Sequence, residues 1–86
     1  MKEVRYSKQA AKALQKMPLK AARAFHKAFD DMANGHSENH QIQPLGGKEK
    51  HCFKIRKGGL RAVVEWIHNG DTLMVLRIKP RGDVYK

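Results

Sequence analysis

The sequence contains a single cysteine, Cys52, among its 86 residues. Without a second cysteine no disulfide can form within the chain, which fits a reducing compartment. No run of residues approaches the roughly 20 apolar positions of a membrane-spanning helix. The first residues lack the apolar core of a signal peptide. We therefore expect a cytoplasmic protein that carries neither a secretion signal nor a membrane anchor.

Acidic residues are also scarce. Eight Asp and Glu stand against 18 Lys and Arg, so the net charge is +10 and the pI is about 10.1. A domain this basic is expected to bind a polyanion, which means RNA, DNA or a strongly acidic protein. A basic protein without any nucleic-acid role is the alternative. The five histidines are scattered and the cysteine is single, so no metal-ligand spacing is visible. We expect no cofactor.

The length allows one small domain, which we place at residues 1–86. Hydrophobic residues make up 41% of the chain, enough for a globular fold and too many for a wholly disordered one. The core of such a domain is modest, so neighbouring chains can contribute to its stability.

Residues 51–67 are predicted to form a β-hairpin. Apolar and basic residues alternate before the turn, as in a half-buried strand. Gly58-Gly59 is a hairpin signal because only glycine adopts positive φ freely. Residues 61–67 then supply a β-branched and aromatic strand. The hairpin carries three basic side chains that we expect to meet on a rigid sheet: Lys54, Arg56 and Arg61.

Two helices are predicted ahead of the hairpin. Ser7 is a good N-cap, and apolar residues at helical spacing indicate a helix over 8–17. Pro18 ends that helix and suits the first turn of the next, predicted over 18–33. Asn34-Gly35 follows as a C-terminal signal, because either residue accepts the left-handed capping conformation. The pair is therefore expected to form a helical hairpin with one apolar face.

The remaining segments complete the expected order of elements. A short first strand is predicted over 2–6, and residues 35–50 show no periodicity and are predicted to be a loop. A third strand of a meander is predicted over 72–78. The order is βααβββ, an α+β fold in which the helical hairpin packs on an antiparallel sheet.

Strict alternation along this last strand divides its side chains between two faces. It places Met74, Leu76 and Ile78 on one face. It places four residues on the other face, namely Leu73, Val75, Arg77 and Lys79.

Several short motifs, in this order, resemble the RelE/ParE superfamily of bacterial toxins. They are Leu45-Gly46, Phe53-Lys54-Ile55-Arg56, Gly59-Leu60-Arg61-Ala62-Val63 and Arg81-Gly82-Asp83-Val84-Tyr85. The chain looks most similar to the RelE branch, whose members are ribosome-dependent mRNA endonucleases. Members of the ParE branch inhibit DNA gyrase with the same fold. The resemblance implies a RelE-like fold and the toxin of a type II toxin–antitoxin system.

The resemblance also implies a site made of sheet-borne cations and a tyrosine near the C-terminus. The matching positions of this sequence are Lys54, Arg56, Arg61, Arg81 and Tyr85, with Lys79 as an alternative to Arg81. Cations of this kind clamp phosphate oxygens, and Lys54 and Tyr85 both remain candidates for the general base. Further contacts to RNA are expected from Lys48, Lys50, Lys57 and Lys79.

The family pattern is not matched everywhere. Leu60 stands where many relatives have an aromatic residue, and Arg56 stands where some have lysine. The sequence ends one residue after Tyr85, so we expect no C-terminal helix.

Implied partners are a cognate antitoxin and the ribosome, with its rRNA and A-site mRNA. Operator DNA is a candidate partner of the toxin–antitoxin complex. Two other functions stay open. One is a ParE-like, non-catalytic inhibitor of gyrase. The other is an inactivated family member that binds its antitoxin and represses transcription with it.

Overall fold

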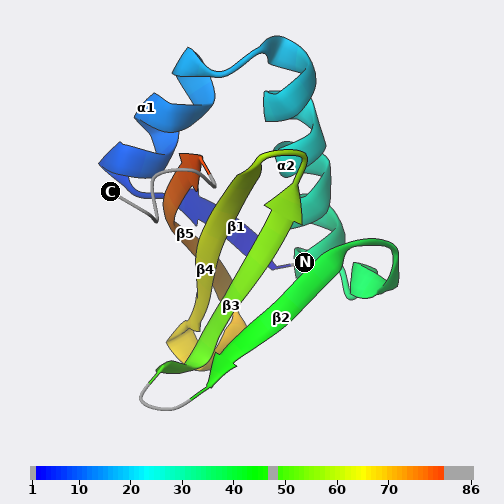
Figure 1. Cartoon of the computed structure of the whole chain (residues 1–86). Helices are drawn as coiled ribbons and strands as arrows, with labels where there is room; N and C mark the ends of the chain where they lie inside the picture. The colour runs from blue at the N-terminus through cyan, green and yellow to red at the C-terminus, as the bar shows by residue number, and fades with distance from the viewer. Residues whose placement is uncertain (1, 47–48, 81–86) are drawn as a thin grey trace.

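The computed structural model describes residues 2–46 and 49–80. Within these residues, two helices cover one face of a five-stranded sheet with the strand order β1-β5-β4-β3-β2 (Figure 1). The α+β class predicted from the sequence is confirmed. The strands are β1 (Glu3–Tyr6), β2 (Gln41–Gly46), β3 (Glu49–Lys57), β4 (Leu60–Ile67) and β5 (Thr72–Pro80).

The helices are α1 (Lys8–Lys16) and α2 (Leu19–Ala33), each within one residue of its predicted bounds. The hydroxyl of Ser7 accepts a hydrogen bond from the backbone N–H of Ala10 at 3.1 Å and so caps α1. The same hydroxyl donates to the carbonyl of Leu76 on β5 at 2.6 Å, which ties the start of the helix to the sheet. Neither helix is long and apolar enough to cross a lipid bilayer.

The hydrophobic core lies between the helices and the sheet. Phe25 and Phe29 of α2 are fully buried and stack with their ring centroids 5.8 Å apart. The sheet contributes Ile55, Ala62, Val64, Leu73, Val75 and Ile78. The opposite face of the sheet carries no helix in the described part of the chain (Figure 1).

The prediction of a loop over residues 35–50 is wrong in part. Residues 35–50 contain a short 3₁₀ turn at Ser37–Asn39 and all of β2, which pairs antiparallel with β3. Ile42 lies opposite Ile55 and packs against the core. Pro44 is tolerated because β2 is an edge strand, where a missing N–H breaks no ladder. The proline and glycines had masked the strand pattern.

The sheet is mixed, whereas the sequence predicted an antiparallel sheet, and the difference lies in the pairing of β1. β1 pairs with β5 in the parallel direction, with Val4 opposite Leu73 and Tyr6 opposite Val75. The pairing joins the two ends of the described chain. No local signal in the sequence specifies which strand β1 will join, because the choice depends on where the helical hairpin leaves room.

The predicted faces of β5 are wrong beyond its middle. Val63 of β4 pairs with Arg77, whereas Val64 pairs with Val75, so Leu76 is an extra residue that forms a β-bulge. A bulge reverses the alternation of the residues after it. Ile78 is consequently buried with Val75, and Arg77 is exposed.

Candidate nucleic-acid interface

The hairpin places its three predicted cations on the face of the sheet away from the helices. Gly58 adopts φ +58° at the turn, which favours glycine, and Lys57 pairs with Leu60 beside it. Arg56 then lies directly opposite Arg61, and Lys54 lies opposite Val63. Ile55, between the two cations of β3, is fully buried on the helix side. The predicted meeting of Lys54, Arg56 and Arg61 on one face is therefore confirmed.

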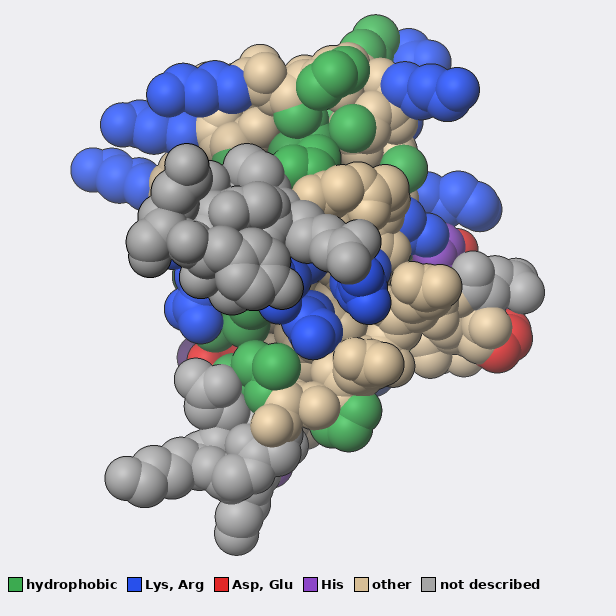
Figure 2. All heavy atoms as spheres, in the orientation of Figure 1, with side chains coloured by type: hydrophobic (Ala, Val, Ile, Leu, Met, Phe, Trp, Pro, Cys, Tyr) green, Lys and Arg blue, Asp and Glu red, His purple; other side chains and the backbone are tan. Residues whose placement is uncertain are grey.

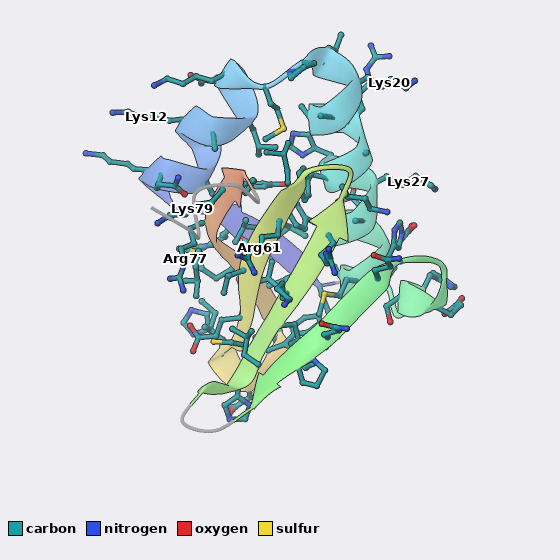
Figure 3. All side chains as sticks on the ribbon, viewed as in Figure 1. Lys12, Lys20, Lys27, Arg61, Arg77 and Lys79 are labelled. Atoms are coloured by element: carbon teal, nitrogen blue, oxygen red, sulfur yellow. The ribbon has the colours of Figure 1, made fainter. Side chains whose placement is uncertain are left out.

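β5 adds two more cations to this face. Lys79 pairs with Arg61, and Arg77 pairs with Val63. Figure 3 shows Arg61, Arg77 and Lys79 on the same side of the ribbon. Arg77 is a residue that the sequence reasoning missed, because strict alternation placed it among core residues. The five side chains are called the outer-face cluster: Lys54, Arg56, Arg61, Arg77 and Lys79.

The outer-face cluster is arranged in two rows that cross the strands. The turn-proximal row consists of Arg56, Arg61 and Lys79, which are direct neighbours on β3, β4 and β5. The turn-distal row consists of Lys54 and Arg77, which flank Val63. Adjacent strands lie about 4.8 Å apart, and two residues along a strand span roughly 6.8 Å. The rows are thus separated by roughly 6.8 Å.

The electrostatics of the turn-proximal row oppose folding. Like charges directly across a strand pair are destabilising, and Arg61 has one on each side. Within the described residues, no member of the cluster forms an ion pair with an acid. Lys and Arg side chains gather in the middle of this face (Figure 2). An anionic ligand would relieve this repulsion, so the arrangement fits phosphate binding.

The amide side chains of β2 extend each row. Gln41 lies opposite Arg56, and Gln43 lies opposite Lys54, and both glutamines are exposed. Amides both donate and accept hydrogen bonds, so they suit contacts with the edge of a base as well as with phosphate.

Lys57 does not join the outer-face cluster, although the sequence suggested it as an RNA contact. Its ammonium donates to Nδ1 of His40 at 2.6 Å, and Nε2 of His40 donates to a carboxylate oxygen of Asp31 at 2.7 Å. An ammonium can only donate, so Nδ1 of His40 is the acceptor in this chain of contacts and Nε2 is the donor. The hydrogen bond from His40 lowers the pKa of Asp31. The chain of contacts links α2 to the β3–β4 turn.

The other predicted site residues are described in part or not at all. Lys48, Arg81 and Tyr85 lie outside the described residues, and for Lys50 only the backbone is described.

The helix cations point away from the outer-face cluster. Lys12 of α1 and Lys20 and Lys27 of α2 project from opposite sides of the molecule (Figure 3). Lys27 approaches the carboxylate of Asp31 at 3.6 Å and is largely exposed. The ordinary role of such residues is a solvated helix surface.

Some hollows formed by the described residues lie away from the outer-face cluster, two of them of similar volume. One, of about 510 Å³, is lined by apolar and basic residues of α1 together with Leu60 and Ile78. The other, also of about 510 Å³, lies between β1 and α2, where the hydroxyl of Tyr6 is hydrogen-bonded to Nδ1 of His26 at 2.9 Å. Burial, and then the charge of Asp30, raise the pKa of Tyr6. Neither hollow contains a member of the outer-face cluster.

Comparison with known families identifies the fold and its relatives. The family described as "ParE toxin of type II toxin-antitoxin system, parDE" matches residues 4–85. The chain belongs to this toxin family. It is therefore a type II toxin of the RelE/ParE superfamily, and the resemblance seen in the sequence is confirmed. No curated protein matches the sequence.

Solved RelE structures share the fold of this toxin. The archaeal RelE–RelB complex from Pyrococcus horikoshii OT3 matches with 27% identity and a TM-score of 0.75, over 94% of this chain and 96% of that chain. The RelB–RelE complex from Methanococcus jannaschii matches with 22% identity and a TM-score of 0.75, over 94% of each chain. Isolated RelE from E. coli matches with 17% identity and a TM-score of 0.72, over 93% of this chain and 84% of that chain.

Proposed function

We propose that this toxin is an mRNA endonuclease that acts on the ribosome. The observation that carries the proposal is the turn-proximal row, in which Arg61 is held between Arg56 and Lys79 on adjacent strands. A row of like charges on a rigid sheet costs stability and suits a ligand whose charge is negative. The phosphodiester of RNA is such a ligand, and its charge increases when it reacts.

The proposed reaction uses the RNA's own 2′-OH. The 2′-oxygen loses its proton to a base and bonds to the adjacent phosphorus. The bond from phosphorus to the 5′-oxygen breaks, and that oxygen takes up a proton. The products are a 2′,3′-cyclic phosphate and a 5′-OH. Arg61 and Arg56 stabilise the doubly charged phosphorane, and Lys54 or Tyr85 serves as the base. Arg81 is proposed as a further clamp on the phosphate.

The ribosome would hold the mRNA in a fixed geometry, which the toxin's own residues do not do. Holding the message in the A site in a reactive geometry can provide much of the barrier reduction. This role places the toxin in the cytoplasm, bound to rRNA as well as to mRNA. Solved relatives include RelE bound to RelB, so we propose that a cognate antitoxin binds this toxin and keeps it inactive. The complex of the two is a candidate ligand of operator DNA.

Inhibition of DNA gyrase is the second candidate function. The observation that favours it is the family match, because the matching family is described by the name ParE. A non-catalytic inhibitor of gyrase has no need for the cations of the turn-proximal row. The two functions therefore make opposite predictions for substitution of Arg61.

The test is a cleavage assay on ribosomes programmed with a defined message. The wild-type protein is expected to cut the mRNA and leave 5′-OH ends. Arg61→Gln is expected to abolish cutting, whereas Arg5→Gln should retain it, because Arg5 lies on the edge strand β1 and is paired with Glu3 at 3.1 Å. Intact message together with blocked supercoiling by gyrase would refute the endonuclease proposal and establish the second candidate.

A further inference from the structure

The β-bulge at Leu76 determines which phosphates the outer-face cluster can reach. Without the extra residue, Arg77 would face the helices together with the fully buried Leu73 and Val75. With it, Arg77 is exposed on the outer face, opposite Val63, which in turn lies opposite Lys54. The bulge therefore creates the turn-distal row.

The two rows lie at different places along the strands, so each row can hold its own phosphate. Within the turn-proximal row, Arg56 and Lys79 each lie about 4.8 Å from Arg61 across the sheet. The turn-distal row begins roughly 6.8 Å further along the strands. A spacing of this size suits neighbouring phosphates of one RNA strand, and proteins read such a strand when it is single-stranded and its bases are unstacked.

We propose that the outer-face cluster binds two consecutive phosphates of a single-stranded RNA, one at each row, and that Arg77 is a phosphate-binding residue of the turn-distal row. The inference rests on the proposed function for the identity of the ligand. It adds to that function the minimum substrate, which is a segment of three nucleotides joined by two charged linkages. Val63, between Lys54 and Arg77, leaves the turn-distal row open at its centre and separates the two cations.

The experiment uses a trinucleotide made of 2′-O-methyl RNA, which cannot be cut because its 2′-oxygens are blocked. Four versions are compared: both linkages charged, each linkage in turn replaced by an uncharged methylphosphonate, and both replaced. Binding to the complete toxin is followed at low salt by NMR titration, with the side-chain Nε–H signals of Arg61 and Arg77 as separate reporters.

Neutralising either linkage is expected to weaken binding by wild-type toxin about tenfold, the value of one charge-assisted contact. In Arg77→Gln, neutralising one linkage should have no further effect, and in Arg61→Gln the same should hold for the other linkage. The slope of log K against log salt should fall by roughly 0.7 in each variant, the value for one phosphate of a single strand. Arg5→Gln, on the same face and paired with Glu3, should bind as wild type.

Three results would overturn the inference. They are an effect at only one linkage, an Arg77→Gln variant that binds like Arg5→Gln, and the absence of measurable binding by wild-type toxin. The result of this binding experiment is independent of the cleavage assay, because binding of the trinucleotide does not require cleavage. If both linkages affect binding but the protein does not cut mRNA on the ribosome, the endonuclease proposal is refuted and the two-phosphate site stands. If Arg77→Gln cuts mRNA on the ribosome at the wild-type rate and only one linkage affects binding, the endonuclease proposal stands and the two-phosphate site is refuted.

Discussion

Removal of the positive charge of Arg61 should make the protein more stable while it abolishes the activity. Arg61 faces Arg56 on one side and Lys79 on the other. Each cross-strand pair changes stability by roughly 0.2–1 kcal/mol, and pairs of like charge are destabilising. Arg61→Gln removes two such pairs and keeps most of the side chain's length. The free energy of unfolding should therefore rise by about 0.4–2 kcal/mol at low salt, which raises Tm by about 2–16 °C for a domain of this size.

The assay is thermal unfolding of the wild type and Arg61→Gln at low and at high salt. The Debye length falls from about 10 Å at 0.1 M to about 3 Å at 1 M, shorter than the spacing of roughly 4.8 Å between paired residues. The difference in Tm should therefore shrink at 1 M salt. Arg5→Gln loses an attraction to Glu3, so its Tm should be unchanged or slightly lower. A lower Tm for Arg61→Gln, or a gain that is the same at both salt concentrations, would refute the reasoning.

Two further substitutions test contacts on the helix side of the sheet. The side-chain amide of Gln9 accepts a hydrogen bond from the N–H of Ile78 at 3.0 Å and donates one to its carbonyl at 3.1 Å. Gln9→Met removes both bonds, so we expect the free energy of unfolding to fall by about 2 kcal/mol and the amide of Ile78 to exchange faster. The hydrogen bond from His40 lowers the pKa of Asp31 below 3.8, so this carboxylate adds stability that is present above pH 3.8 and is lost as the pH falls through the lower folded value. Urea midpoints should fall less on acidification in Asp31→Asn than in the wild type.

The elements with local signals could be predicted from the sequence. The cap at Ser7, the break at Pro18 and the glycine turn at Gly58 act within a few residues, so they fixed the helices and the hairpin to within a few positions. The meeting of Lys54, Arg56 and Arg61 followed from the hairpin alone, because the turn sets the register of the two strands.

The elements that depend on distant partners could not be predicted in the same way. β2 is recognisable as a strand only once Ile42 is seen to lie opposite Ile55, since Pro44 and the adjacent glycines resemble loop sequence. The parallel pairing of β1 with β5 joins residues almost 70 positions apart, as with Glu3 and Thr72. Such pairings are decided by the packing of the whole domain, which no short window of sequence contains.

The bulge in β5 differs from these cases, because the sequence does contain a signal for it. Strict alternation from Leu73 would bury both Arg77 and Lys79 beside the phenylalanines of α2. Burial of an unpaired charge costs far more than one unpaired backbone position at a bulge. The strand must therefore change face between Val75 and Arg77, which is where the extra residue lies. The positive charge that suits Arg77 to phosphate is thus also the reason why Arg77 reaches the outer face.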